Sequence, residues 1–227
     1  NLKPEEATNL TLGLAFEPQD NLSFTLDYFK IEQKDVVFNS PVFVLEQAYI
    51  HQNPAYISSV TRAEGGKGYI VSLHAPNDNI AERTIDGIDF AALYTLDSSI
   101  GLWNFNFELS HFLTFDYQAS KGAPLTDAIG TYDASFGNIP KNRANLTTTW
   151  QGDTFNAIYN VEYISATTES NGHVMESSNM HHLQVGYHYE DFGTDINFGI
   201  KNLFDKEPPL RYGGTNGVDF DTYSLRG

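Results

Sequence analysis

The feature that most limits how this chain can fold is the alternation of apolar and polar side chains along it. The clearest stretch sets four apolar residues against four polar ones: Trp103, Phe105, Phe107 and Leu109 against Asn104, Asn106, Glu108 and Ser110. Successive side chains of a β-strand point to opposite faces, so this pattern predicts a strand with one apolar and one polar face. Seven further segments are predicted as strands: residues 10–16, 22–28, 87–94, 144–150, 155–163, 183–189 and 196–200.

A ninth strand is predicted to begin at Tyr223 and to continue to Gly227. No convincing period of 3.6 residues occurs in these segments. Aromatic residues make up 14% of the chain, and such side chains suit a pleated, half-buried surface. The predicted fold class is therefore all-β.

The connections between the predicted strands alternate in length. Short links occupy residues 17–21, 97–101, 151–153 and 190–194, whereas the link after the second strand runs for about fifty residues to Arg83. The other longer links are residues 116–140, 165–179 and 206–222. Outer-membrane barrels have short periplasmic turns and long external loops, whereas a sandwich with Greek-key links has no reason to sort its connections in this way. The alternation favours an up-and-down barrel.

Charged side chains within the predicted strands fall on the polar face: Asp27, Asp89, Glu108, Glu162 and Lys201. A Lys facing the middle of a bilayer costs about 2–4 kcal/mol, and Asp or Glu somewhat less. These five residues are therefore predicted to line a wet lumen. Aromatic residues such as Trp103, Trp150 and Tyr189 gather at strand ends, where rings with a polar tip favour the headgroup level. A half-exposed soluble sheet is the alternative interpretation.

Composition excludes several classes of partner and chemistry. The net charge of −16 would repel a phosphate backbone, so nucleic acid is not an expected partner. The absence of Cys excludes disulfides and thiolate sites. No run of 18 apolar residues predicts a transmembrane helix, although a barrel strand needs only about 9–11 residues. Because the sequence starts at Asn1 without a signal peptide, it is interpreted as a piece of a longer protein.

Four segments carry a resemblance to a known family: residues 1–6 (NLKPEE), 83–89 (RTIDGID), 199–206 (GIKNLFDK) and 223–227 (YSLRG). They resemble, in order, the start of a descending strand, a strand start after a long external loop, the "G-x-x-N-L-F-D-K" segment and the beginning of the last strand in TonB-dependent receptors. The resemblance extends over essentially the whole chain. It implies an antiparallel up-and-down transmembrane β-barrel of about 22 strands, of which residues 1–227 would be roughly the last nine.

The resemblance also implies a function. Such a protein would bind a scarce nutrient at external loops in the Gram-negative outer membrane and import it with TonB-coupled energy. The plug domain that contacts the TonB complex, the earlier strands and the end of the last strand would lie outside this chain. The nutrient could be a siderophore, cobalamin, an oligosaccharide or a peptide. A passive porin-type channel and a soluble all-β ligand-binding module are the alternatives.

The candidate ligand-binding residues lie in two long connections: Tyr49, Tyr56, Arg62, Tyr69, Arg211 and Tyr212. Aromatic platforms with a few polar groups can hold sugars, peptides or aromatic chelators. Long loops also use Tyr to pack against themselves, which is the alternative explanation for each residue.

Catalysis and metal binding have little support in the sequence. The Gly-x-Ser-x-Gly and His-Glu-x-x-His motifs are absent, no Ser/His pair of an outer-membrane hydrolase is recognisable, and neither an enzyme nor a cofactor is expected. The soft-metal ligands His173, Met175, Met180, His181 and His182 cluster in sequence. Adjacent strand residues such as His181 and His182 point to opposite faces, so no metal site is expected.

Overall fold

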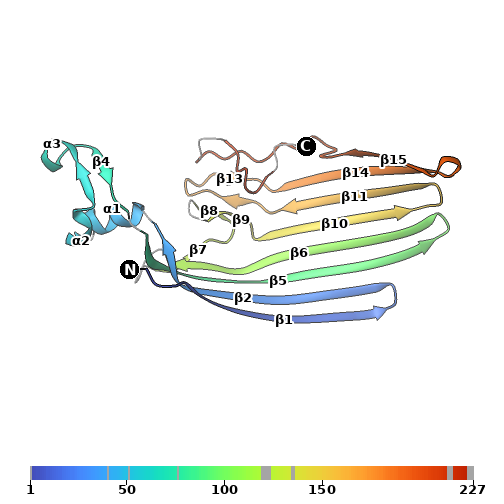
Figure 1. Ribbon diagram of the computed structural model, residues 1–227, viewed down its shortest axis with the longest axis horizontal. Coiled ribbons are helices and arrows are strands. Elements are labelled where there is room, and N and C mark those ends of the chain that lie inside the picture. The colour runs from blue at the N-terminus through green and yellow to red at the C-terminus, as the bar shows by residue number, and fades with distance from the viewer. Residues whose placement is uncertain are drawn as a thin grey trace. The chain divides into compact units, whose positions relative to one another are not determined.

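The computed structural model describes residues 2–39, 41–50, 52–75, 77–118, 124–133, 136–213 and 217–223. Eight long strands dominate it: β1 (Glu6–Gln19), β2 (Leu22–Phe38), β5 (Asp78–Ser98), β6 (Gly101–Gln118), β10 (Asn142–Gln151), β11 (Phe155–Ile164), β14 (Ser178–Tyr189) and β15 (Thr194–Ile200). In the sheet they follow the order β1-β2-β5-β6-β10-β11-β14-β15, as Figure 1 shows. Each long strand therefore pairs with its neighbours along the chain, and the sheet does not close on itself.

All eight predicted strands are confirmed, and most are longer than predicted. β2 and β5 extend furthest, to 17 and 21 residues. The added parts lie beyond the clean alternation, where polar residues occupy both faces, so only backbone pairing marks them as strand. The ninth member of the sheet is β7 (Thr126–Asp127), which pairs with β6. The predicted ninth strand mostly lies outside the described residues, and Tyr223, its expected first residue, lies in a bend.

The chain divides into two compact units. Unit 1 comprises residues 1–9, 31–85 and 115–127, and unit 2 comprises residues 10–30, 86–114 and 128–227. β1, β2, β5 and β6 contribute to both units, whereas β10, β11, β14 and β15 belong to unit 2 alone. Unit 2 therefore holds the part of the sheet in which the predicted polar-face charges lie.

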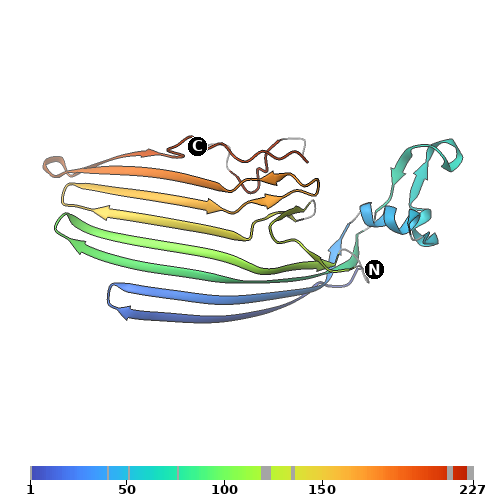
Figure 2. The ribbon, with the colours of Figure 1, turned by 180° about the vertical axis from the view of Figure 1, so that it is seen from behind.

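The short connections are all in unit 2 and join neighbouring strands at one end of its sheet, as the view from behind in Figure 2 shows. Two of them have only two residues between strands, at positions 20–21 and 99–100. The turn between β14 and β15 contains a 3-10 helix (η1, Glu190–Phe192) and ends at Gly193, whose φ of 55° suits glycine. The predicted sorting of short and long connections is confirmed.

The longer connections carry structure of their own. β8 (Thr131–Asp133) and β9 (Gly137–Ile139) lie between β6 and β10, and β12 (Thr167–Thr168) and β13 (Val174–Met175) lie between β11 and β14. These four strands form a second sheet in the order β13-β12-β8-β9. Two connections that are separate in sequence are thus joined by backbone hydrogen bonds in unit 2.

The connection between β2 and β5 is partly helical, which the sequence did not predict. It holds α1 (Pro41–Tyr49), α2 (Pro54–Ile57), β3 (Val60–Arg62), α3 (Ala63–Gly66) and β4 (Ile70–Leu73), and is shorter than the predicted fifty residues because β2 and β5 are longer. α1 and α2 both begin with proline, which suits the first helical position. Val44 and Ala48, four residues apart on α1, are almost fully buried and form a small local core.

In the part of the chain that the structure describes, no dry apolar core lies between the long strands. The buried hydrophobic residues are Val44, Ala48, Phe115, Ala128, Ile139, Met175 and Tyr223, and of these only Phe115 belongs to a long strand. Within the described residues, Figures 1 and 2 show no second layer of secondary structure over either face of the unit 2 sheet. No helix among the described residues is long and apolar enough to span a membrane.

Candidate functional site

The strand register gives the unit 2 sheet two chemically different faces. On one face, Phe107 pairs with Leu146 and Leu146 with Val161. Another apolar row, two rows away on the same face, runs through Trp103, Trp150, Ala157, Val185 and Phe198. Rows on the other face are polar, running through Asn106, Thr147, Asn160 and His182 and through Glu108, Asn145 and Glu162. The predicted opposition of Trp103, Phe105 and Phe107 to Asn104, Asn106 and Glu108 is confirmed.

The apolar face is uncovered: its residues are exposed on the outer strands β1 and β15 and mostly partly exposed on the strands between them. Leu14, Phe198 and Val185 are 64%, 63% and 44% exposed, and Phe24 and Phe105 are partly exposed and not buried. Aromatic rings contact each other across strands, with centroids 6.1 Å apart for Phe24 and Phe90. Near the turns, Trp103 and Trp150 are paired at 6.0 Å. Soluble monomers rarely leave so large a contiguous apolar surface uncovered, so this face needs an apolar neighbour.

The polar face is hollowed. A hollow of about 560 Å³, the polar hollow, is lined by side chains from β2, β5, β6, β10 and β11. It brings together four of the predicted lumen-lining carboxylates with a hydroxyl and a guanidinium: Asp27, Asp89, Glu108, Glu162, Ser110 and Arg143. The Ser110 hydroxyl donates a hydrogen bond to Asp89 over 2.6 Å, which ties β6 to β5 inside the hollow.

Lys201 occupies a different place from the four carboxylates. It follows the last residue of β15 and is therefore not in mid-strand, contrary to the prediction. It lines a separate hollow of about 310 Å³, together with Asn160 and His182 on the polar face. In this hollow the Asn160 side chain also contacts β10.

Polar side chains connect neighbouring strands on the hollowed face. The Asn160 amide donates hydrogen bonds to Asn145 over 2.6 Å and to Thr147 over 2.9 Å. At Gly186 the missing side chain leaves room for the amides of Asn156 and Asn197, which a Cβ would overlap. The face is thus built from hydrogen-bonding groups that tolerate water.

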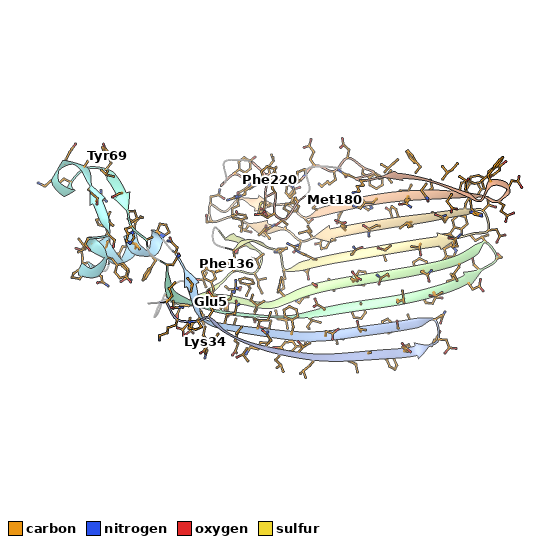
Figure 3. The ribbon with its side chains drawn as sticks, in the orientation of Figure 1. Glu5, Lys34, Tyr69, Phe136, Met180 and Phe220 are labelled. Carbon is orange, nitrogen blue, oxygen red and sulfur yellow. The ribbon has the colours of Figure 1, made fainter. Side chains whose placement is uncertain are left out.

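The predicted ligand-binding residues of unit 1 are partly used in internal contacts. Arg62 donates a hydrogen bond to the Tyr49 hydroxyl over 2.7 Å, and its guanidinium lies 4.6 Å from the centre of the Tyr49 ring. Arg62 also donates to the Gly68 carbonyl. Tyr56 packs edge-on against Phe43, whereas Tyr69, labelled in Figure 3, is 75% exposed. Tyr69 therefore has the most accessible side chain of the four predicted residues in unit 1.

The two predicted ligand-binding residues of unit 2 also differ in exposure, since one is held by internal contacts and the other is accessible. The Arg211 guanidinium lies 3.7 Å above the Tyr132 ring, and its Nε is 3.6 Å from the Glu169 carboxylate. Tyr212 is 67% exposed and packs edge-on against His173, with ring centroids 4.2 Å apart. Arg211 is thus a structural side chain, and Tyr212 is an accessible one.

Glu169 and Tyr132 were not singled out from the sequence. Glu169 lies in the turn between β12 and β13, where the Gly172 N–H donates to its carbonyl oxygen over 2.9 Å. The Asn171-Gly172 pair beside it is a common signal for a tight hairpin turn and could have located this hairpin. No local signal indicates that the Glu169 side chain contacts residues more than forty positions away.

The histidines and methionines of the predicted cluster are separated in the structure. Met175 is fully buried. His181 forms a 2.7 Å hydrogen bond with the Tyr159 hydroxyl, whereas the His182 ring accepts the Asn202 backbone N–H and lies 3.7 Å from Glu162. The opposite orientation of the adjacent histidines is confirmed. The described part of the chain contains no group of three or more His, Cys, Asp or Glu placed to hold a metal ion.

The Asn-Leu-Phe-Asp segment forms a turn after β15. Asn202 and Asp205 have φ values of 51° and 50°, a left-handed conformation that Asn and Asp tolerate better than most residues. The Asn202 side chain accepts the Lys206 N–H and donates to its carbonyl oxygen. The Leu203 N–H continues the pairing with β14 by donating to His181. This explains why the segment needs Asn and Asp at these two positions.

A meander of long strands with one exposed apolar face, one hollowed polar face and short turns at one end defines a segment of an up-and-down β-barrel. The family model described as TonB dependent receptor-like, beta-barrel, matches residues 1–203. The chain therefore belongs to the family of TonB-dependent receptor-like β-barrels. No curated protein gives a significant match to the chain.

Solved structures with the same fold include three receptors or transporters. A mutant of the ferric enterobactin receptor from Pseudomonas aeruginosa is 19% identical, with a TM-score of 0.58 over 96% of this chain and 28% of its own. The apoprotein form of the FrpB iron transporter from Neisseria meningitidis is 14% identical, with a TM-score of 0.61 over 95% and 29%. The ferric yersiniabactin uptake receptor from Yersinia pestis is 12% identical, with a TM-score of 0.55 over 93% and 27%. The chain thus spans less than a third of each of these proteins.

Proposed function

We propose that this chain is the C-terminal part of the barrel of an outer-membrane receptor, which binds a scarce nutrient at external loops and imports it with TonB-coupled energy. The observation that carries the proposal is the pairing of an exposed apolar face with a hollowed, charged face on a meander whose connections are sorted by length. Family membership supports the same conclusion. The earlier strands and a plug domain that contacts the TonB complex would belong to other parts of the same protein.

The two faces support a membrane position for the sheet. Lipid tails would cover the apolar face at no cost, and every backbone group of a closed barrel is paired. The reverse orientation would bring Asp27, Asp89, Glu108 and Glu162 against lipid, with an unfavourable free energy for each charge. In the proposed orientation these carboxylates and Lys201 line a wet lumen, and the short turns lie on the periplasmic side.

The external loops would carry the ligand surface. Of the six candidate residues, Tyr69 and Tyr212 have the most exposed rings, while Arg62 and Arg211 hold other loop residues in place. We therefore assign direct ligand contact to the two tyrosines and a supporting role to the arginines. The similar structures are named for ferric enterobactin, iron and ferric yersiniabactin, so a ferric chelate is one nutrient class to test first. Cobalamin, an oligosaccharide and a peptide are the other nutrient classes to test.

A passive porin-type channel is the second candidate, because the hollowed polar face would suit any water-filled barrel. The experiment that separates the two uses the complete receptor in a Gram-negative host that lacks its own uptake route for a ferric chelate. Uptake that depends on the receptor and stops when TonB is deleted supports active import. Uptake that persists without TonB and rises linearly with external concentration would overturn it in favour of the porin. The remaining alternative, a soluble all-β ligand-binding module, is tested by purification, because such a module would be a monodisperse monomer without detergent.

A further inference from the structure

The Glu169 side chain is a buried carboxylate in an external connection of unit 2. It lies in the turn between β12 and β13, and only 5% of the residue is exposed. A buried carboxylate is costly unless it is hydrogen-bonded and balanced by positive charge. Three partners that help to meet this requirement come from the connection that follows β15.

Three consecutive residues of that connection surround the carboxylate. The Tyr212 N–H donates to Oε2 over 2.9 Å, and the Gly213 N–H donates to Oε1 over 2.8 Å. The Arg211 Nε lies 3.6 Å from Oε1. A Cβ at position 213 would lie 2.8 Å from the same oxygen, so glycine allows the close approach. One side chain therefore fixes the backbone of residues 211–213.

Two further contacts join the same segments. The His173 Nε2 lies 3.1 Å from the Leu210 carbonyl oxygen, and the His173 ring packs edge-on against Tyr212. On the other side, the Arg211 guanidinium covers the Tyr132 ring of β8. Residues 210–213 are thus held by the β12–β13 hairpin and by β8 together.

We propose that Glu169 is the positioning residue of a latch that joins the β11–β14 connection to the connection after β15. The latch sets the Tyr212 and His173 rings into one rigid external surface. Binding of a nutrient on this surface rests on the proposed function, whereas the latch itself does not. Because its hydrogen bonds run to backbone N–H groups, Glu169 fixes the path of the loop directly, and glycine at position 213 leaves room for the carboxylate.

The test is hydrogen exchange on the complete receptor in detergent micelles, followed for the peptide that covers residues 210–213. In Glu169→Ala, we expect amide exchange in this peptide to become at least about tenfold faster, since charge-assisted hydrogen bonds are lost. Glu169→Gln, which keeps an acceptor oxygen without the charge, should give an intermediate rate. Glu176→Gln, an exposed acidic residue beyond β13, is the matched control and should leave the rate unchanged.

Exchange in β10 and β11 verifies in each variant that the sheet has folded. Unchanged exchange at residues 210–213 in a folded Glu169→Ala receptor would overturn the latch. The same variants are then assayed for binding of a ferric chelate. Faster exchange with weaker binding supports the latch as a ligand-positioning device. Faster exchange with unchanged binding retains the latch but contradicts the assignment of this surface to the nutrient.

Discussion

The amide of Asn160 on β11 donates a hydrogen bond to the Asn145 side chain on β10, and the two atoms are 2.6 Å apart. The same amide reaches Thr147, so one side chain bridges two residues of the neighbouring strand. Cross-strand pairs of this kind are the unit of stability in a sheet that lacks an apolar core. On the hollowed face of this protein, polar pairs therefore do part of what apolar packing does elsewhere.

Replacing Asn160 with alanine should lower the free energy of unfolding by about 1–2 kcal/mol, because two hydrogen bonds are lost at a water-accessible site. Urea unfolding of the complete receptor in detergent measures the change. A double-mutant cycle with Asn145→Ala should give a coupling energy of about 0.5–1.5 kcal/mol. Strictly additive effects would show that the Asn160–Asn145 contact contributes nothing.

Two neighbouring residues of β14 test the orientation of the sheet. Val185 belongs to the apolar row with Ala157 and Phe198, whereas Gln184 pairs with Ile158 and Gly199 on the other face. Val185→Arg should destabilise the barrel by up to about 2–4 kcal/mol, because the charge would face lipid. Gln184→Arg should change stability by less than about 0.5 kcal/mol. Folding into lipid bilayers measures both changes in free energy. If Gln184→Arg destabilises the protein more than Val185→Arg does, the lipid-facing and lumen-facing sides are assigned the wrong way round.

Acid should release the latch at Glu169. Burial raises the pKa of this carboxyl, but the N–H groups of Tyr212 and Gly213, with His173 and Arg211, lower it by more, so the net pKa lies below its ordinary value of 4.5. A depressed carboxyl pKa stabilises the folded loop above the ordinary value, and this stability is lost as the pH falls through the lowered pKa. Exchange at residues 210–213, corrected for its intrinsic pH dependence, should therefore accelerate below about pH 4.5.

The Glu169→Gln receptor supplies the control for this pH dependence. Its side chain does not titrate, so the acid-dependent acceleration of exchange at residues 210–213 that is due to Glu169 should be absent. If the wild-type and Glu169→Gln receptors show the same acid-dependent acceleration of exchange, a group other than Glu169 causes it.

The exposed ring of Tyr212 is expected to contribute directly to ligand binding. Tyr212→Ala should weaken binding of the imported nutrient about tenfold, because an aromatic contact at a binding surface is lost. Tyr212→Phe should keep most of the affinity if the ring face makes the contact. Isothermal titration on the complete receptor measures both, and Tyr56→Phe, in a side chain packed on Phe43, is the comparison variant. Equal affinities for wild type and Tyr212→Ala would exclude Tyr212 from the ligand surface.

The strands could be predicted because two different surroundings act on alternate residues. Wherever a strand separates an apolar from a polar environment, as at Trp103 and Asn104, the alternation is imposed on every residue and is visible without a structure. Where that separation ends, as at the far parts of β2 and β5, the signal disappears although the backbone pairing continues. α1 escaped prediction for a related reason, since Val44 and Ala48 are the buried residues among its described side chains and make a short apolar pattern.

The loop contacts could not be predicted from local sequence. The carboxylate of Glu169 is recognised by backbone N–H groups of Tyr212 and Gly213, which every residue except proline possesses, so no side-chain pattern marks the partners. Similarly, Arg62 and Arg211 looked like free ligand-binding cations. Instead, Arg62 contacts the Tyr49 ring and donates to the Gly68 carbonyl, and Arg211 lies over the Tyr132 ring within ion-pair distance of Glu169. The sequence placed these residues in long connections but did not distinguish side chains that hold a loop from side chains that face outward.

The nearest-neighbour order of the long strands has a consequence for how such a protein can diversify. Because β10 lies between β6 and β11 in the sheet, and β11 lies between β10 and β14, lengthening the connection between two long strands leaves the pairing register of the long strands intact. Entropy penalises such insertions weakly, by about 0.6 kcal/mol for each doubling of loop length. The connections can therefore accumulate changes while the long strands keep their hydrogen-bond ladder unaltered.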